Sequence, residues 1–150
     1  SKIIWVSLDE YKNIWFETEF EILDNTISKK DHNETSNRLL DIFRAIQKLN
    51  PEFFNLNNGF KITTLLEFPK NWGLGTSSTL INSLAKVDAY RLLDLTFGGS
   101  GYDIACAQNN TAITYQLIYN NENSHLVENV SKRLINQVLF NPVFKNHLYL

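Results

Sequence analysis

Residues 69–79 form the segment best suited to chemistry, a glycine loop that leads from a predicted strand into a predicted helix. Its sequence is PKNWGLGTSST. The first backbone N–H groups of a helix lack internal partners and carry the positive end of the helix dipole, so glycines just before them let a phosphate approach closely. The hydroxyl groups at 76–79 add donors for phosphate oxygens and potential ligands for Mg²⁺. The loop therefore predicts a phosphate cradle, and the alternative is a turn in which Thr76 or Ser77 caps the helix.

A second glycine loop, GGSGYD at 98–103, places an acidic side chain next to a flexible backbone. Small residues follow Asp103, so its carboxylate can approach a substrate hydroxyl as a general base or orient it electrostatically. The alternative is that Asp103 caps a short helix over 103–108. Cys106 is predicted to be a small buried packing residue rather than a nucleophile, because no histidine lies near it in the sequence.

Three common glycine motifs do not fit these loops. A Walker A loop needs a lysine before its Ser or Thr, which neither loop has. A dinucleotide-binding fingerprint needs Gly or Ala where Ser78 stands and an acidic residue at the end of a second strand, whereas Asp94 lies in a helical stretch. The spacing around Ser100 is one residue short of a nucleophile elbow, which argues against a serine hydrolase.

The elements that position these loops alternate between strand and helix patterns. Alternating apolar residues predict a hairpin from 2–8 and 14–22, and strands at 60–68 and 111–119; helical spacing predicts helices at 33–50, after the loop at 73–75, at 88–93 and at 103–108. Residues 124–140 fit either a helix or two short strands, and 147–150 resemble the start of a strand. This order predicts an α+β fold.

Two groups of polar residues are interpreted as surface. Glu17, Glu19 and Glu21 share one face of the second strand, which favours a solvated outer face over a cation site. His32 has no second ligand at metal spacing and is predicted to be exposed.

The composition limits the possible partners. The chain has 150 residues, 43% hydrophobic and 20% charged, with a net charge of −2 and no block of like charge. This predicts a globular protein with a small-molecule partner, and argues against nucleic acid and membrane. No apolar run reaches the roughly 18 residues of a membrane span, and the single cysteine cannot form an internal disulfide, so we expect a reducing, cytoplasmic compartment. The chain contains no Met and opens directly into a strand pattern, so we expect a partial chain.

Together the two loops resemble the GHMP kinases, the family of galactokinase, homoserine kinase, mevalonate kinase and phosphomevalonate kinase. The matching features are a strand, a proline and GLGTSS at a helix start, followed by GSGYD and small residues. The string GYDIA at 101–105 is similar to the signature of the subgroup named after it, which resembles mevalonate and phosphomevalonate kinases. The resemblance extends from the first hairpin to residue 118.

The resemblance implies roles for the matching residues, with ATP and Mg²⁺ as cofactors. Asp103 falls on the catalytic aspartate, and the hydroxyl of Ser77 falls on the one that helps to hold Mg²⁺. The phosphate-loop positions that would bind the nucleotide are Gly73, Leu74, Gly75, Thr76, Ser77 and Ser78.

The chain also departs from the family pattern. Asn71 and Trp72 replace the small residues usual before GLG, and Trp72 could stack on a base or fill the core. Leu92 stands where mevalonate kinases carry a second Mg²⁺ carboxylate, which leaves Asp88, Asp94 or no residue in that role.

The implied fold is a two-layer GHMP-kinase N-terminal domain, ribosomal protein S5 domain 2-like, with helices on one face of a sheet. It would span residues 1–140, and 141–150 would begin a truncated C-terminal domain. The implied function is ATP-dependent phosphorylation of an alcohol or phosphate of a metabolite such as mevalonate or phosphomevalonate. Because the family's N-terminal substrate segment and C-terminal glycine motif do not occur in these residues, we expect them to be inactive alone. The alternatives are a non-catalytic nucleotide- or anion-binding module and, more remotely, a structural protein.

Overall fold

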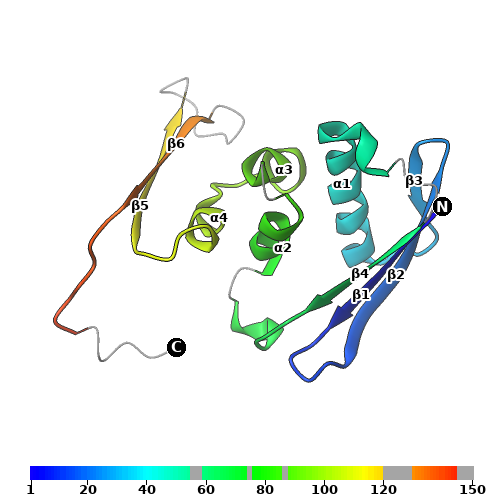
Figure 1. Cartoon of the computed structure of the whole chain (residues 1–150), viewed down its shortest axis with the longest axis horizontal. Helices are drawn as coiled ribbons and strands as arrows, with labels where there is room; N and C mark the ends of the chain where they lie inside the picture. Colours follow the sequence, from blue (N-terminus) through cyan, green and yellow to red (C-terminus); the bar gives the residue numbers. More distant parts are fainter. Residues whose placement is uncertain (55–58, 74–75, 86–87, 120–129, 145–150) are drawn as a thin grey trace. The chain divides into compact units, whose positions relative to one another are not determined.

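The computed structural model contains helices and sheets in an α+β arrangement, as predicted (Figure 1). It describes residues 1–54, 59–73, 76–85, 88–119 and 130–144. Their contacts divide the chain into two compact units, Ser1–Thr76 and Ser77–Leu150. The boundary expected at residue 140 stays a prediction, and the strand expected at 147–150 lies outside the described residues.

The first unit is built on a four-stranded sheet with the order β3-β2-β1-β4. Its strands are β1 (Lys2–Leu8), β2 (Ile14–Leu23), β3 (Thr26–Lys29) and β4 (Phe60–Leu65). β1 pairs antiparallel with β2 and parallel with β4. The predicted hairpin is confirmed, and Asp9 closes its turn, because its Oδ1 accepts from the backbone N–H groups of Tyr11 at 3.0 Å and Asn13 at 2.7 Å.

The helix α1 (Glu34–Leu49) covers one face of this sheet (Figure 1). The side chain of Asn33 caps it by accepting from the N–H of Thr35, and the 3₁₀ helix η1 (Pro51–Phe54) follows. Phe43 is fully buried and meets the rings of Trp5 and Phe20 edge-on, with ring centroids 5.9 and 5.0 Å apart. These aromatic contacts form the centre of the core and hold α1 on the sheet.

The opposite face of β2 is polar, as predicted. Glu19 and Glu21 make ion pairs with Lys2 at 2.6 Å and with Lys30 at 2.9 Å, and all four side chains are substantially exposed. Glu17 and His32 are also exposed. The glutamates therefore act as a solvated face.

β4 ends three residues before the predicted end at residue 68. Its neighbour β1 ends at Leu8, whose carbonyl accepts from the N–H of Leu66 at 3.0 Å. Beyond that point β1 offers no further partner, so the ladder stops there. The 3₁₀ helix η2 (Lys70–Trp72) then leads to Gly73.

The second unit contains three helices and a hairpin among its described residues. The helices are α2 (Thr76–Leu84), α3 (Ala89–Thr96) and α4 (Tyr102–Ala107), and β5 (Ile113–Tyr119) pairs antiparallel with β6 (Val130–Gln137). Asp88 caps α3 by accepting from the N–H of Arg91. Residues 124–140 fit either a helix or two short strands by sequence, and within them 130–137 form one strand, which pairs along the whole of β5.

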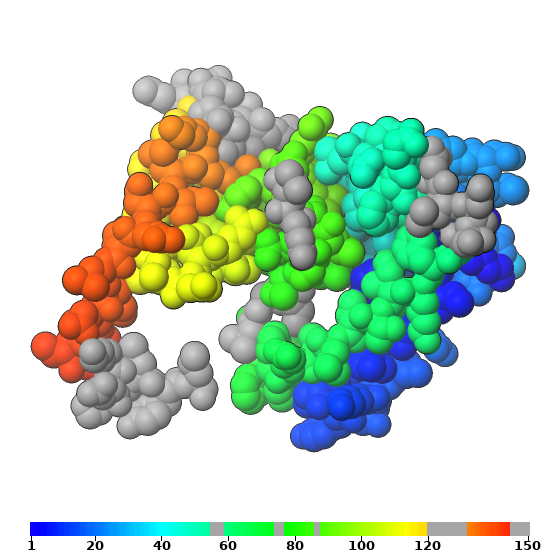
Figure 2. All heavy atoms as spheres, in the orientation of Figure 1, coloured from blue at the N-terminus to red at the C-terminus, as the bar shows by residue number. Residues whose placement is uncertain are grey.

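The segment after β6 is apolar and poorly covered. Figure 2 shows residues 138–144 in orange and red, extending from the end of β6 as a single thin strip. Leu139 and Val143 are 97% and 100% exposed. No helix among the described residues is both long and apolar enough to cross a membrane.

Candidate functional site

The second unit brings the hydroxyl of Ser78 next to the carboxylate of Asp103. Ser78 lies in the first turns of α2 and Asp103 in the first turn of α4. Ser78 Oγ donates to Asp103 Oδ2 at 3.4 Å. This distance is long for a hydroxyl–carboxylate hydrogen bond, so the two groups are adjacent without being tightly paired. The second loop and the helix after the first loop therefore present their polar groups at one place.

A second hydrogen bond links α2 to the residue that follows α4. Gln108, just after α4, donates through Nε2 to Oδ1 of Asn82 in α2 at 2.9 Å. Ile104 and Ala105 are fully buried, whereas Asp103 is exposed. Burial of the apolar side of α4 thus leaves the carboxylate accessible to solvent and to a ligand.

Asp103 does not cap its helix. Gly101 occupies the cap position, with a φ of 79°, and the helix begins at Tyr102, whose N–H donates to Ser100 Oγ at 3.2 Å. Because Asp103 is already inside the first turn, its carboxylate is free of the capping role that was the structural alternative. It also lies at the positive end of this short helix, where a negative charge is favourable.

The residues of the first loop are described only in part. Gly73 is exposed in the left-handed conformation, with a φ of 70°, and an added Cβ would meet nothing within 4 Å. Ser77 is exposed in the first turn of α2, which begins at Thr76. Leu74 and Gly75 lie outside the described residues. Trp72 is 60% exposed, so it does not fill the core.

The two aspartates considered as substitutes for the second Mg²⁺ ligand have other partners. Asp88 caps α3, and Asp94 pairs with Arg133. Leu92 is fully buried. Within the described ranges, no group of three His, Cys, Asp or Glu side chains could hold a metal ion. The ligand that the resemblance implies for Mg²⁺, the hydroxyl of Ser77, is exposed in the first turn of α2, and oxygen donors of this kind suit Mg²⁺.

Sequence reasoning missed a cluster centred on Arg133 of β6. Its guanidinium binds Asp94 of α3 through two hydrogen bonds, of 2.7 and 3.2 Å, and its Nε donates to the carbonyl of Ser100 at 3.1 Å. It also lies over the ring of Tyr90, 4.9 Å from the centroid. The hydroxyl of Tyr115 donates to the same Ser100 carbonyl. These residues are far apart in the sequence, and no local pattern connects them.

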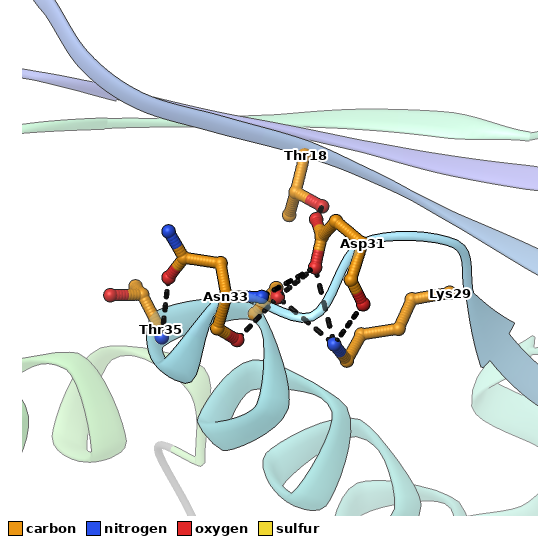
Figure 3. A network of polar contacts seen from close by, with 6 residues as sticks. Thr18, Lys29, Asp31, Asn33 and Thr35 are labelled. Carbon is orange, nitrogen blue, oxygen red and sulfur yellow. Dashed lines mark hydrogen bonds and ion pairs between the residues drawn. The ribbon is translucent and has the colours of Figure 1, made fainter.

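Sequence reasoning also missed a polar cluster in the first unit, at the junction of β3 and α1 (Figure 3). Asp31 accepts hydrogen bonds from Ser36 and Thr18, and the Nζ of Lys29 donates to its Oδ1 at 3.1 Å and to its carbonyl at 2.5 Å. The hydrogen bonds from Ser36 and then Thr18 hold the pKa of Asp31 far below its ordinary value. A shallow cleft of about 200 Å³ adjoins the cluster and is lined by Thr18, Glu19, Glu21, Ser28, Lys29, Lys30 and Asp31.

The prediction that Cys106 is buried is wrong. Its side chain is exposed, because Ile104 and Ala105 occupy the inner side of α4. Tyr102, one turn earlier, lies on the same side of the helix, and its hydrogen bond to Cys106 raises the pKa of the phenol. The small size of cysteine indicated burial, but the position of Cys106 along this six-residue helix places its side chain on the exposed side.

Comparisons with protein-family models, with curated proteins and with solved structures found no match to this chain.

Proposed function

We propose that this chain is the nucleotide-binding part of a GHMP-type small-molecule kinase, with ATP as phosphoryl donor and the hydroxyl or phosphate of a small metabolite as acceptor. The observation that carries the proposal is the 3.4 Å contact between Ser78 and Asp103. A kinase of this type needs the hydroxyls of the phosphate loop and the acidic residue at one place, because the transferred phosphoryl group must lie between them.

The resemblance implies the roles of the residues, and the chemistry of their side chains suits those roles. The N–H groups and hydroxyls at the start of α2 would bind phosphate oxygens. Ser77 would contribute a ligand to Mg²⁺, which supplies neutralisation of phosphate charge when bound. Asp103 would accept the proton of the acceptor hydroxyl or orient that hydroxyl for attack. Its exposure and its freedom from helix capping support this role.

The finer description of the fold belongs to the same proposal. A ribosomal protein S5 domain 2-like arrangement requires a sheet with helices on one face. The first unit, with α1 on one face of the four-stranded sheet and glutamates on the other, supports that assignment.

The first experiment measures binding and turnover separately. We expect ATP with Mg²⁺ to raise the melting temperature of the protein, since a ligand that binds only the folded state stabilises it. ADP release is then measured with a panel of isoprenoid and sugar alcohols. A shift in melting temperature would support nucleotide binding, and ADP release would in addition refute the expectation that these residues are inactive alone. No shift at all would refute both the kinase and the nucleotide-binding module.

The second experiment tests Asp103 itself. In a form of the protein that turns over ATP, Asp103→Asn should preserve folding and ATP binding while kcat falls by at least about 10²-fold, the usual effect of losing acid–base assistance. Glu34→Gln is the matched control, because Glu34 is also an exposed acid in the first turn of a helix. Equal kcat values in the two variants would remove Asp103 from the catalytic step.

A further inference from the structure

We propose that Arg133 is a positioning residue for Asp103, acting through the glycine loop at 98–101. This role in the reaction rests on the proposed function. The mechanical link itself rests only on contacts within the second unit, so the two can be tested apart.

Arg133 joins three parts of the second unit that are separate in sequence. Its side chain is 13% exposed, and its guanidinium binds both carboxylate oxygens of Asp94 while its Nε binds the carbonyl of Ser100. The planar guanidinium allows these bonds at the same time, whereas a lysine ammonium would act as a point charge. Arg133 thus ties β6 to α3 and to the loop before α4.

The loop held in this way has little stiffness of its own. Gly98, Gly99 and Gly101 have φ values of 64°, 102° and 79°, a region that glycine adopts without steric cost. A loop with three such residues has many alternative conformations, so external contacts must select one of them. Arg133 and Tyr115 both donate to the Ser100 carbonyl and so fix the loop at its centre.

The loop is also enclosed at its end. A Cβ at Gly101 would lie 2.9 Å from Cδ1 of Tyr90 and 3.3 Å from Nε of Arg133. Gly101 is therefore packed directly against the Tyr90 ring and the guanidinium that covers it.

The position of Gly101 determines where α4 begins. Gly101 is the cap residue of α4, and Asp103 stands two residues further, in the first turn. Because Gly101 directly precedes this six-residue helix, a change in the backbone at Gly101 would move the first residues of the helix, including Asp103. The contact of Asp103 with Ser78 is already long at 3.4 Å, so a small displacement would separate them.

The variant that tests the link is Arg133→Lys. It retains the positive charge beside Asp94 but cannot bind Asp94 and the Ser100 carbonyl at the same time, as a guanidinium does. The matched control is Arg38→Lys, a change in an arginine whose ion pair with Glu34 is exposed. Tyr115→Phe is a second variant, because it removes the other donor to the Ser100 carbonyl and keeps the ring.

Two measurements without nucleotide read out the link. Hydrogen exchange at residues 98–107 should accelerate by about 10-fold or more in Arg133→Lys, with little change in α1, because local opening is controlled by local contacts. The side-chain ¹³C carboxyl resonance of Asp103, assigned by its loss in Asp103→Asn, should move toward its position in Ser78→Ala. A change in overall stability alone would not move this resonance in the folded protein.

The outcomes separate clearly. The proposal is overturned if Arg133→Lys leaves the exchange rates and the Asp103 resonance as they are in Arg38→Lys. In a form that turns over ATP, kcat should fall while KM for ATP stays within about 2-fold, because only the acceptor side is displaced. An unchanged kcat despite faster exchange would reject the positioning role. Absence of ATP binding by the wild-type protein would refute the proposed function, and the two nucleotide-free measurements would still decide the link.

Discussion

Replacing Asp31 with asparagine should destabilise the first unit, because it leaves a nearly buried lysine without its counter-charge. The side chain of Lys29 is only 7% exposed, and its Nζ donates to Asp31 Oδ1 at 3.1 Å and to Ser36 Oγ at 3.2 Å. The asparagine side chain would retain an acceptor oxygen but not the negative charge. The substitution therefore isolates the electrostatic part of the cluster in Figure 3.

The size of the effect follows from the exposure of the two partners. Removing one member of a buried ion pair costs about 3–5 kcal/mol. The side chain of Asp31 is 39% exposed, so water screens part of the interaction and we expect a loss of about 2 kcal/mol. Lys29→Met removes the unpaired charge, so the double variant should lose less than the sum of the two single variants, with a coupling of about 1–2 kcal/mol.

The assay is urea unfolding followed by tryptophan fluorescence. All three tryptophans, Trp5, Trp15 and Trp72, belong to the first unit, so the signal reports on that unit. Glu34→Gln is the control, because it breaks an exposed pair with Arg38 worth about 0.3–0.5 kcal/mol. A loss for Asp31→Asn no greater than for this control, or strictly additive effects in the double variant, would refute the reasoning.

Three further predictions concern pH, backbone and thiol chemistry. The folded-state pKa of Asp31 lies below its ordinary value of 3.8, so the ionised Asp31 stabilises the fold fully above that pH, and this contribution is lost as the pH falls below it. Below that pH the free energy of unfolding, measured by tryptophan fluorescence, should therefore fall less steeply in Asp31→Asn than in the wild type. Gly98→Ala and Gly101→Ala both place a side chain at a positive φ, which should lower the free energy of unfolding by about 1–2 kcal/mol. Only the Cβ of Gly101→Ala also meets the Tyr90 ring, so this variant should lose about 1–3 kcal/mol more. Urea unfolding followed by far-UV circular dichroism measures both losses, and equal values would contradict the packing described for Gly101. Cys106 should be modified by a maleimide in the folded protein without prior unfolding, and protection in mass spectrometry would contradict its exposure.

Local signals in the sequence were sufficient for much of the fold. The hairpin of β1 and β2 follows from alternation on either side of a turn closed by Asp9, and α1 follows from Asn33 and its apolar spacing. The cap of α3 by Asp88 is equally local. Each of these features is determined by residues within a few positions of one another, so a single sequence contains the required information.

Features that depend on distant partners were not predictable in the same way. β6 could be distinguished from a helix only by its pairing with β5, and Arg133 reveals its role only through Asp94 and Ser100. For the candidate site, the two loops identified Ser78 and Asp103, but their proximity depends on hydrogen bonds between segments that are distant in the sequence.

The central position of β1 in the sheet has a consequence for the order of folding. β2 can pair with β1 as soon as the first hairpin has been synthesised, whereas β4 pairs with the other edge of β1 only after α1 has been made, with Ile3 opposite Phe60. Closing this long connection costs more chain entropy than closing the hairpin, and parallel pairing across it is correspondingly slow. We therefore expect β4 to join the sheet last. Until it does, one edge of β1 remains open to pairing with another chain, which makes this intermediate the species most prone to aggregate.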